Sequence, residues 1–198
     1  MISTRRLARC AAFLGLLLMP AVASANAGVP MILITFPLMA IALVPIALIE
    51  SAIVSARLGQ SFGASLKVVG LANALSTLVG LPVTWLTLVA AQLLTGGSGA
   101  YGIESIRSKF LAVTWQAPWL IPYEAHLYWM VPAACLTLLI PFFLASYQIE
   151  YRVVARLMRG NTKAAVARAM FRANLVSYSL LFLADIAWLT YAVLHARN

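Results

Sequence analysis

The sequence predicts an all-α integral membrane protein, a four-helix bundle built from two parallel helical-hairpin repeats after a cleavable signal peptide. Three observations predict this fold class. The 198 residues are 63% hydrophobic and only 10% charged, whereas soluble domains average roughly 25% charged residues. Four apolar runs are long enough to cross a bilayer, which takes about 20 residues. The two halves also share a pattern of polar residues.

The first 27 residues have the composition of a signal peptide. The basic stretch MISTRRLAR precedes the apolar stretch CAAFLGLLLMPAVA, and the small residues that follow offer cleavage after Ala25 or Ala27. Arg5 and Arg6 raise the alternative of twin-arginine export. The residues after this pair fit that motif poorly, so we favour ordinary secretory export. If the segment is not cleaved, it becomes an additional helix.

Each predicted hairpin contains two membrane spans. The first hairpin covers residues 28–94, with spans at 30–56 and 68–94, and the second covers 129–198, with spans at 129–149 and 173–194. Prolines lie inside three of the four spans: Pro37, Pro45, Pro82, Pro132 and Pro141. Each should bend its helix because proline cannot donate a backbone hydrogen bond. Neighbouring helices can bond the carbonyls that this leaves free.

A periplasmic or lumenal loop is predicted between the hairpins, at residues 95–128. It begins with the Gly-rich stretch TGGSGAYG and continues into a predicted amphipathic surface helix at 103–115. Apolar residues recur there at helical spacing: Ile103, Ile106, Phe110 and Val113. The aromatic residues that follow are typical of a membrane–water interface: Trp115, Trp119, Tyr123, Tyr128 and Trp129.

The distribution of Lys and Arg predicts the orientation. Arg57 and Lys67 flank the first short connection, and six further basic residues fill the predicted loop 152–172. Basic residues concentrate in cytoplasmic loops, so the N- and C-termini should lie on the periplasmic side of a bacterial inner membrane. Signal-peptide export gives the same orientation. Topology and contact with anionic lipid headgroups explain loop 152–172, so we expect no nucleic-acid partner.

The two halves share a repeated polar pattern. Ile49-Glu50 matches Ile149-Glu150, Ala72-Asn73 matches Ala173-Asn174, Ser76 matches Ser177, and Trp85-Leu86 matches Trp188-Leu189. The helical rise places each Glu at the same depth as its Asn, so we expect the two side chains to hydrogen-bond. Six residues are therefore predicted to join helices or to line a path: Glu50, Asn73, Ser76, Glu150, Asn174 and Ser177.

Asp185 is a separate candidate site residue. It lies near the middle of the fourth span and outside the repeated pattern, on a helix face with Asn174, Tyr178, Leu181 and Trp188. A charged side chain at that depth costs about 2.5 kcal/mol or more, so intramembrane acids are functional candidates by default. We expect its carboxyl group to be protonated or paired.

Motifs of soluble enzymes are absent from the sequence. His126 and His195 belong to no cluster with metal-ligand spacing, and Cys135 in its apolar run is expected to be a buried small hydrophobe. The stretch GGSGA at 96–100 lacks the final glycine of a nucleophile elbow. We therefore expect no catalytic residue, no metal and no cofactor.

The stretch IALVPIALIESAIVSARLGQSFGASLKVVGLANALSTLVGLPVTW, at residues 41–85, carries a resemblance. Its pattern of Ile-Glu, a basic loop and Asn-x-x-Ser-x-x-x-Gly is similar to uncharacterised bacterial multi-pass membrane proteins. More faintly, it resembles FraC-like filament-integrity membrane proteins. The resemblance implies a membrane scaffold at cell–cell contacts or septa.

Two functions are compatible with this sequence. The leading expectation is a non-enzymatic membrane scaffold or assembly component, with other membrane proteins or further copies of the chain as partners. The alternative is a small oligomeric transporter or channel whose path includes Glu50, Glu150 and Asp185.

Overall fold

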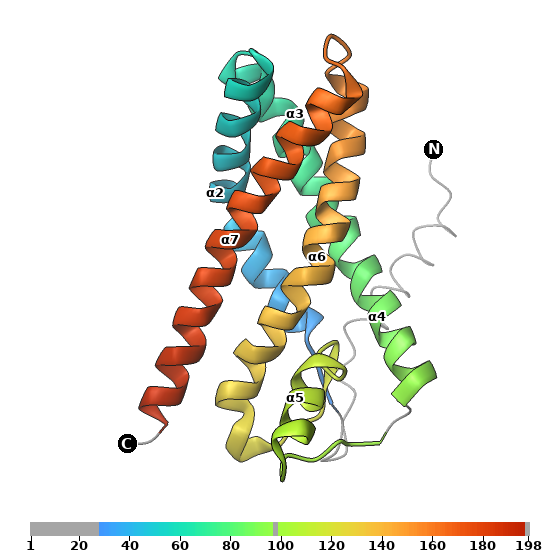
Figure 1. Ribbon diagram of the computed structural model, residues 1–198, viewed down its shortest axis with the longest axis vertical. Helices are drawn as coiled ribbons and strands as arrows, with labels where there is room; N and C mark the ends of the chain where they lie inside the picture. The colour runs from blue at the N-terminus through green and yellow to red at the C-terminus, as the bar shows by residue number, and fades with distance from the viewer. Residues whose placement is uncertain (1–27, 97–98, 197–198) are drawn as a thin grey trace, which may run out of the picture.

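The described chain is helical apart from one short pair of strands. The computed structural model describes residues 28–96 and 99–196, so the predicted signal peptide at 1–27 lies outside the described residues. The elements are β1 (Val29–Pro30), α2 (Ile32–Leu58), α3 (Phe62–Leu75), the π-helical segment η1 (Ser76–Gly80), α4 (Leu81–Gly96), α5 (Ile106–Thr114), β2 (Trp119–Leu120), η2 (Glu124–His126), α6 (Leu127–Leu157) and α7 (Lys163–His195) (Figure 1).

Four helical segments are long and apolar enough to cross a membrane: Ile32–Leu58, Phe62–Gly96, Glu124–Leu157 and Lys163–His195. The predicted loop 152–172 was wrong, because α6 continues to Leu157, α7 starts at Lys163, and only 158–162 connects them. An apolar run marks only the part of a helix suited to the bilayer core. Lys and Arg are good helix formers, so the helices extend into the basic segment.

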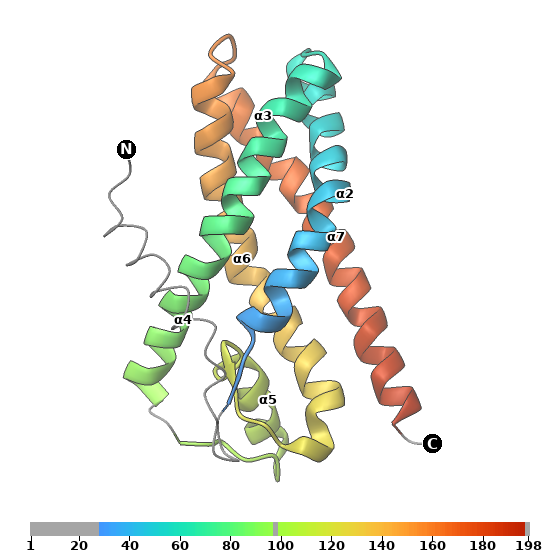
Figure 2. The same cartoon turned by 180° about the vertical axis from the view of Figure 1, so that it is seen from behind.

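The four long helical segments form a closed ring. α2 packs against α3 and α7, and α6 packs against the same two helices. The α2–α3 and α6–α7 connections lie at the same end of the bundle, called here the connection end. At the opposite end α4 and α7 diverge to opposite sides (Figures 1 and 2). The helices therefore lie closest together near the connections and spread apart toward the other end (Figures 1 and 2).

The two connections begin differently but end with the same kind of N-cap. Gly59 caps α2 in the left-handed conformation, with φ of 63°, which glycine adopts without steric cost. Ser61 then caps α3 by accepting a hydrogen bond from the Ala64 N–H at 3.3 Å. Thr162 caps α7 in the same way, accepting from the Ala165 N–H at 3.2 Å. Polar caps of this kind fix where α3 and α7 begin.

The predicted bend at Pro82 takes the form of a π-helical segment. In η1 the widened turn is closed by a hydrogen bond from the Leu81 N–H to the Ser76 carbonyl, and Pro82 follows directly. Proline lacks the N–H that would bond the carbonyl four residues earlier. A Cβ atom on Gly80 would come within 2.7 Å of the Ile149 Cδ1 atom, so this glycine permits the close approach of α6.

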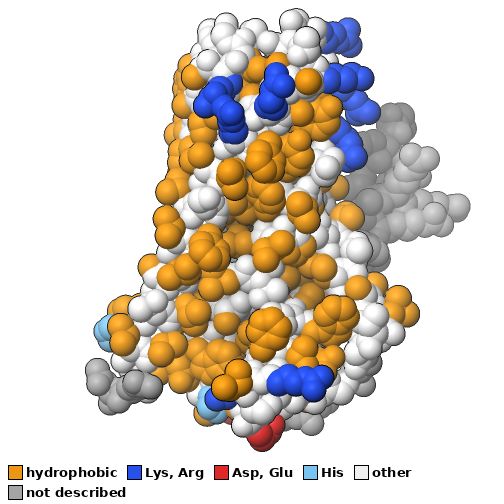
Figure 3. Space-filling model, viewed as in Figure 1, with side chains coloured by type: hydrophobic (Ala, Val, Ile, Leu, Met, Phe, Trp, Pro, Cys, Tyr) orange, Lys and Arg blue, Asp and Glu red, His pale blue; other side chains and the backbone are white. Residues whose placement is uncertain are grey.

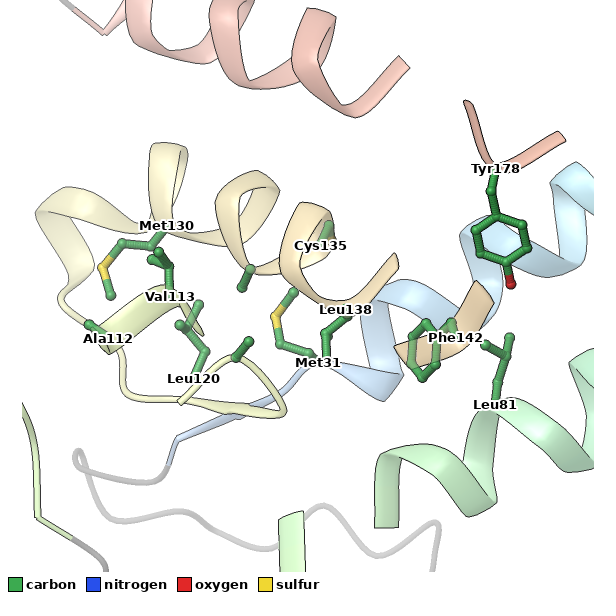
Figure 4. Packing of buried hydrophobic residues seen from close by; sticks show 12 residues of the cluster. Met31, Leu81, Ala112, Val113, Leu120, Met130, Cys135, Leu138, Phe142 and Tyr178 are labelled. Atoms are coloured by element: carbon green, nitrogen blue, oxygen red, sulfur yellow. The ribbon is translucent and has the colours of Figure 1, made fainter. Parts of the chain in front are cut away.

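An apolar core fills the end of the bundle opposite the connections. Its side chains come from α2, α4, α5, α6, α7 and the segment before η2, and Figure 4 shows Met31, Leu81, Leu120, Met130 and Phe142 among them. Ala117 and Leu120 have no exposed surface. The segment between α4 and α6 is therefore part of the fold.

The predicted surface helix at 103–115 is shorter in the structure, where α5 covers Ile106–Thr114. Its apolar side chains divide between two environments. Ile106 and Phe110 are 89% and 62% exposed, whereas Val113 is buried in the core. α5 thus packs on the bundle through its last turns and presents apolar side chains outward from its first turns.

Charged and apolar side chains occupy different zones of the surface. In Figure 3 a group of Lys and Arg side chains lies near the connection end, and hydrophobic side chains cover the middle of the same face. Large apolar side chains are exposed on all four long helical segments, including Ile41 at 77%, Val83 at 56%, Ile140 at 67% and Leu183 at 60%. A wide apolar band of this kind is what a lipid-facing surface presents.

Candidate functional site

Six buried polar side chains meet between the two hairpins, near the connection end. They form the Glu–Asn–Ser cluster: Glu50 on α2, Asn73 on α3, Ser76 at the start of η1, Glu150 on α6, and Asn174 and Ser177 on α7. None is more than 3% exposed. The structure thus brings together six of the seven site residues proposed from the sequence and leaves Asp185 elsewhere.

Within each hairpin the Asn amide bonds the Glu carboxyl group. The Nδ2 atom of Asn73 donates to Oε2 of Glu50 at 2.7 Å, and that of Asn174 donates to Oε2 of Glu150, also at 2.7 Å. Each amide also donates to the backbone carbonyl four residues earlier, that of Val69 or Met170. The contact expected between each Glu and its Asn is therefore present in both hairpins.

The serines connect one hairpin to the other. Ser76 donates its hydroxyl proton to Oε1 of Glu150 at 2.6 Å, and Ser177 donates to Oε1 of Glu50, also at 2.6 Å. Each Glu is thus bonded by the Asn of its own hairpin and by the Ser of the other. Every oxygen of the two carboxyl groups accepts a hydrogen bond from another helix.

This exchange between hairpins does not follow from the pattern within either hairpin alone. The available signal was the spacing of three between each Asn and Ser, which places both side chains on one helix face. Two side chains spaced in this way do not point in the same direction, so together they can contact two neighbouring helices. In a ring of four helices, α3 lies beside both α2 and α6, so its Asn and its Ser reach different partners.

Helix starts set the common height of the cluster. Asn73 lies twelve residues after the N-cap Ser61, and Asn174 lies twelve residues after the N-cap Thr162. At 1.5 Å rise per residue both amides are about 18 Å along their helices. The equal spacing places the two Asn–Ser pairs at one level, where they meet the two glutamates.

Apolar layers enclose the cluster on both sides. Toward the connections lies a buried group that includes Val54, Val69, Val154 and Val166, each without exposed surface. Toward the other end lies Tyr178, whose hydroxyl oxygen is 2.9 Å from that of Ser146 on α6. In a dry environment each hydrogen bond is electrostatically stronger, and an unpaired polar group is correspondingly more costly.

The two carboxyl groups are also neighbours in the cluster. The side chains that bond to them are neutral amides and hydroxyls. Chemically, the cluster resembles a hydrogen-bonded junction between helices in which all four carboxyl oxygens are occupied. The amide oxygen of Asn174 is buried without a partner among the described residues.

Asp185 lies on α7, eight residues beyond Ser177, which is about 12 Å along the helix. It is half-buried and lines a cavity of about 260 Å³ between α2, α6 and α7. Neither glutamate of the cluster lines this cavity. The three acidic residues therefore occupy two separate environments in the described structure.

The remaining candidates fit structural roles. Cys135 is a buried free thiol, 5% exposed, in the apolar core. The Nδ1 atom of His126 lies 3.4 Å from the Trp129 indole N–H, which donates to it. Within residues 28–96 and 99–196, no group of three or more His, Cys, Asp and Glu side chains is arranged to hold a metal ion.

Comparisons of the chain with protein-family models, with curated proteins and with solved structures found no match.

Proposed function

We propose that the chain is a non-enzymatic scaffold or assembly component of a bacterial inner membrane. The observation that supports this most directly is the use of the buried polar side chains. All four carboxyl oxygens of Glu50 and Glu150 accept bonds from other helices, so these groups hold the bundle together and are not presented to a substrate. Partners would be other membrane proteins or further copies of the chain, bound through the apolar outer surface.

The proposed architecture is two parallel hairpin repeats after a cleavable signal peptide. Its support is the matched set of contacts in the two hairpins: the same N-cap bonds on the second helix, the same Glu–Asn bonds and the same exchanged serines. Parallel repeats related by an axis along the membrane normal are an established way to build a membrane bundle. The glutamate pair would then lie on that axis.

The proposed orientation has the connections in the cytoplasm and both termini in the periplasm. Eight Lys and Arg residues lie in the connection 158–162 or on the helix ends near the two connections, where they would also meet anionic lipid headgroups: Arg57, Lys67, Arg152, Arg156, Arg159, Lys163, Arg168 and Arg172. The described basic residues elsewhere are Arg107 and Lys109 on α5.

Reporter fusions test this orientation. Alkaline phosphatase fused after residue 110 should be active, and fused after residue 62 or 160 it should be inactive, because the enzyme folds only outside the cytoplasm. Green fluorescent protein at the same three positions should give the reverse pattern and serves as the control. Fluorescence from the fusion after residue 110 would overturn the orientation.

The scaffold role is tested by assembly and by flux together. Extracted from native membranes into lipid nanodiscs, the chain should appear by native mass spectrometry in complexes of fixed stoichiometry. Reconstituted into liposomes, it should leave proton and ion permeability at the level of protein-free vesicles. A purely monomeric chain would contradict the proposal.

A small transporter or channel is the second candidate, and the cavity beside Asp185 is the observation that favours it. An acidic side chain on a membrane helix beside a cavity is a common feature of transport paths. Flux that the wild-type chain supports and the Asp185→Asn variant abolishes would replace the scaffold proposal with this one. Flux unchanged in that variant would contradict a transport role for Asp185.

A further inference from the structure

The cavity beside Asp185 has the size and lining of a small-molecule site. Its volume is about 260 Å³, close to the lower limit of about 300 Å³ for ligand pockets in general. Three helices line it, mostly with apolar and aromatic side chains: Thr35 and Met39 from α2, Cys135 and Phe142 from α6, and Asp185 and Trp188 from α7. Its lining residues on α7 belong to the C-terminal half of that helix, which diverges from the rest of the bundle in Figure 1.

Asp185 is the unsatisfied polar group of this cavity. Within the described residues, its carboxyl group is half-buried and has no hydrogen-bond or ion-pair partner. The neighbouring hydroxyl of Thr35 already donates to the Met31 carbonyl at 2.9 Å. A carboxyl group on a membrane helix usually pairs with another polar group or faces water. Here no described side chain completes such a pairing, which leaves the carboxyl group open to a partner that enters the cavity.

The lining indicates what that group is. A cation beside Asp185 would neutralise a carboxylate in apolar surroundings, where charge pairing is strongest. The ring faces of Trp188 and Phe142 attract cations through their π-electrons. The remaining apolar lining, such as Leu139 and Met39, suits hydrocarbon. We propose that this cavity binds a lipophilic monovalent cation, with its ammonium group at Asp185 and its hydrocarbon part among these side chains.

Two other occupants fit the lining less well. A lipid acyl chain would fill the apolar volume and leave the carboxyl group unpaired. A second copy of the chain would have to bring a cation to the same depth, and the described long helices carry Lys and Arg only toward their connection ends. The nearest Lys or Arg on α7 is Arg172, thirteen residues or about 20 Å along the helix from Asp185.

A pair of matched probes tests the proposal. Benzyltrimethylammonium carries one positive charge, and neopentylbenzene has the same shape with carbon in place of nitrogen. Binding of each is measured by equilibrium dialysis against the full chain in nanodiscs of neutral lipid, with empty nanodiscs as the background. The wild-type chain should bind the cation at least about tenfold more tightly than the neutral probe, which corresponds to ~1.4 kcal/mol.

Variants then assign this preference to Asp185. Asp185→Asn should weaken cation binding by about tenfold and leave binding of the neutral probe unchanged, whereas Asp185→Glu should keep most of the preference. Glu104→Gln also replaces a carboxyl group by an amide, but outside the long helices. It should change the binding of neither the cation nor the neutral probe. Saturable quenching of fluorescence by the cation should be lost in Trp188→Phe.

Three results would overturn the proposal. Cation binding that is unchanged in Asp185→Asn would place the cation elsewhere. Equal or tighter binding of neopentylbenzene by the wild-type chain would identify an apolar site such as an acyl-chain groove. Binding of the cation no greater than to empty nanodiscs would exclude the site. The comparison of probes on the wild-type chain decides the matter even if a variant fails to fold.

Discussion

Replacing Glu150 by alanine is expected to lower the free energy of unfolding by about 3 kcal/mol. Glu150 is 2% exposed and accepts hydrogen bonds from Asn174 and Ser76. Alanine would remove both bonds, leave an amide proton without its partner, and create a cavity between helices. Unfolding by sodium dodecyl sulfate in bicelles, followed by circular dichroism, measures the change.

Glutamine at the same position should cost much less, about 1 kcal/mol. Its amide oxygen can accept from Asn174, and its amide nitrogen can donate to the Ser76 hydroxyl oxygen. The Ser76 proton can then go to the Asn73 carbonyl, which already lies 3.0 Å away. A glutamine variant as unstable as the alanine variant would show that the junction depends on charge. An alanine variant as stable as the wild type would contradict the junction itself.

A double-mutant cycle isolates the bond between the hairpins. Ser76→Ala and Glu150→Ala should couple by about 1 kcal/mol, because each removes one partner of the same 2.6 Å bond. The matched control is Ser179→Ala, an exposed serine on α7 that donates only to the backbone carbonyl of Leu175. It should show no coupling to Glu150→Ala. The equivalent cycle of Ser177 and Glu50 should match the first one in size.

Much of this arrangement follows from the sequence because it depends on local rules. Four apolar runs predict four long helices, and the rise of an α-helix predicts that Glu50 and Asn73 stand level across a short turn. That bond is present at 2.7 Å. Helix ends were less predictable. The apolar run of the third span stops at about residue 149, whereas α6 continues to Leu157. Arginine is a good helix former, so the helix continues beyond the apolar run.

Contacts between the hairpins could not be predicted in the same way. The bond from Ser177 to Glu50 spans 127 residues, and no helical spacing determines which of two neighbouring helices a side chain meets. The cavity beside Asp185 could not be predicted for the same reason. Its lining comes from three helices, and it exists because α7 diverges from the bundle. Sequence spacing predicted Leu181, Asp185 and Trp188 on one face of α7 without indicating what faces them.

Removing Trp85 should open the end of the molecule opposite the connections while leaving the Glu–Asn–Ser cluster intact. The indole N–H of Trp85 donates to the Pro118 carbonyl at 2.7 Å, and its ring stacks on that of Trp119 with centroids 6.0 Å apart. The same Pro118 carbonyl accepts from the Met31 N–H at 3.1 Å. The Pro118 carbonyl thus joins the segment before α6 to Trp85 of α4 and to Met31 at the start of α2.

Trp85→Ala is expected to cost about 3 kcal/mol, the usual loss for a large aromatic side chain cut to alanine, and to act locally. Trypsin cleavage at Arg107 and Lys109 on α5 should become at least about tenfold faster, because local opening is what exposes a backbone to protease. Trp85→Phe keeps the stacking and loses only the hydrogen bond, so its cleavage rate should be intermediate.

Glu150→Ala is the control for a global effect. It should lower the free energy of unfolding of the whole bundle and have little selective effect on cleavage at α5. Equal cleavage in Trp85→Ala and wild type would mean that the apolar contacts of Leu120 and Ala117 hold this segment without Trp85.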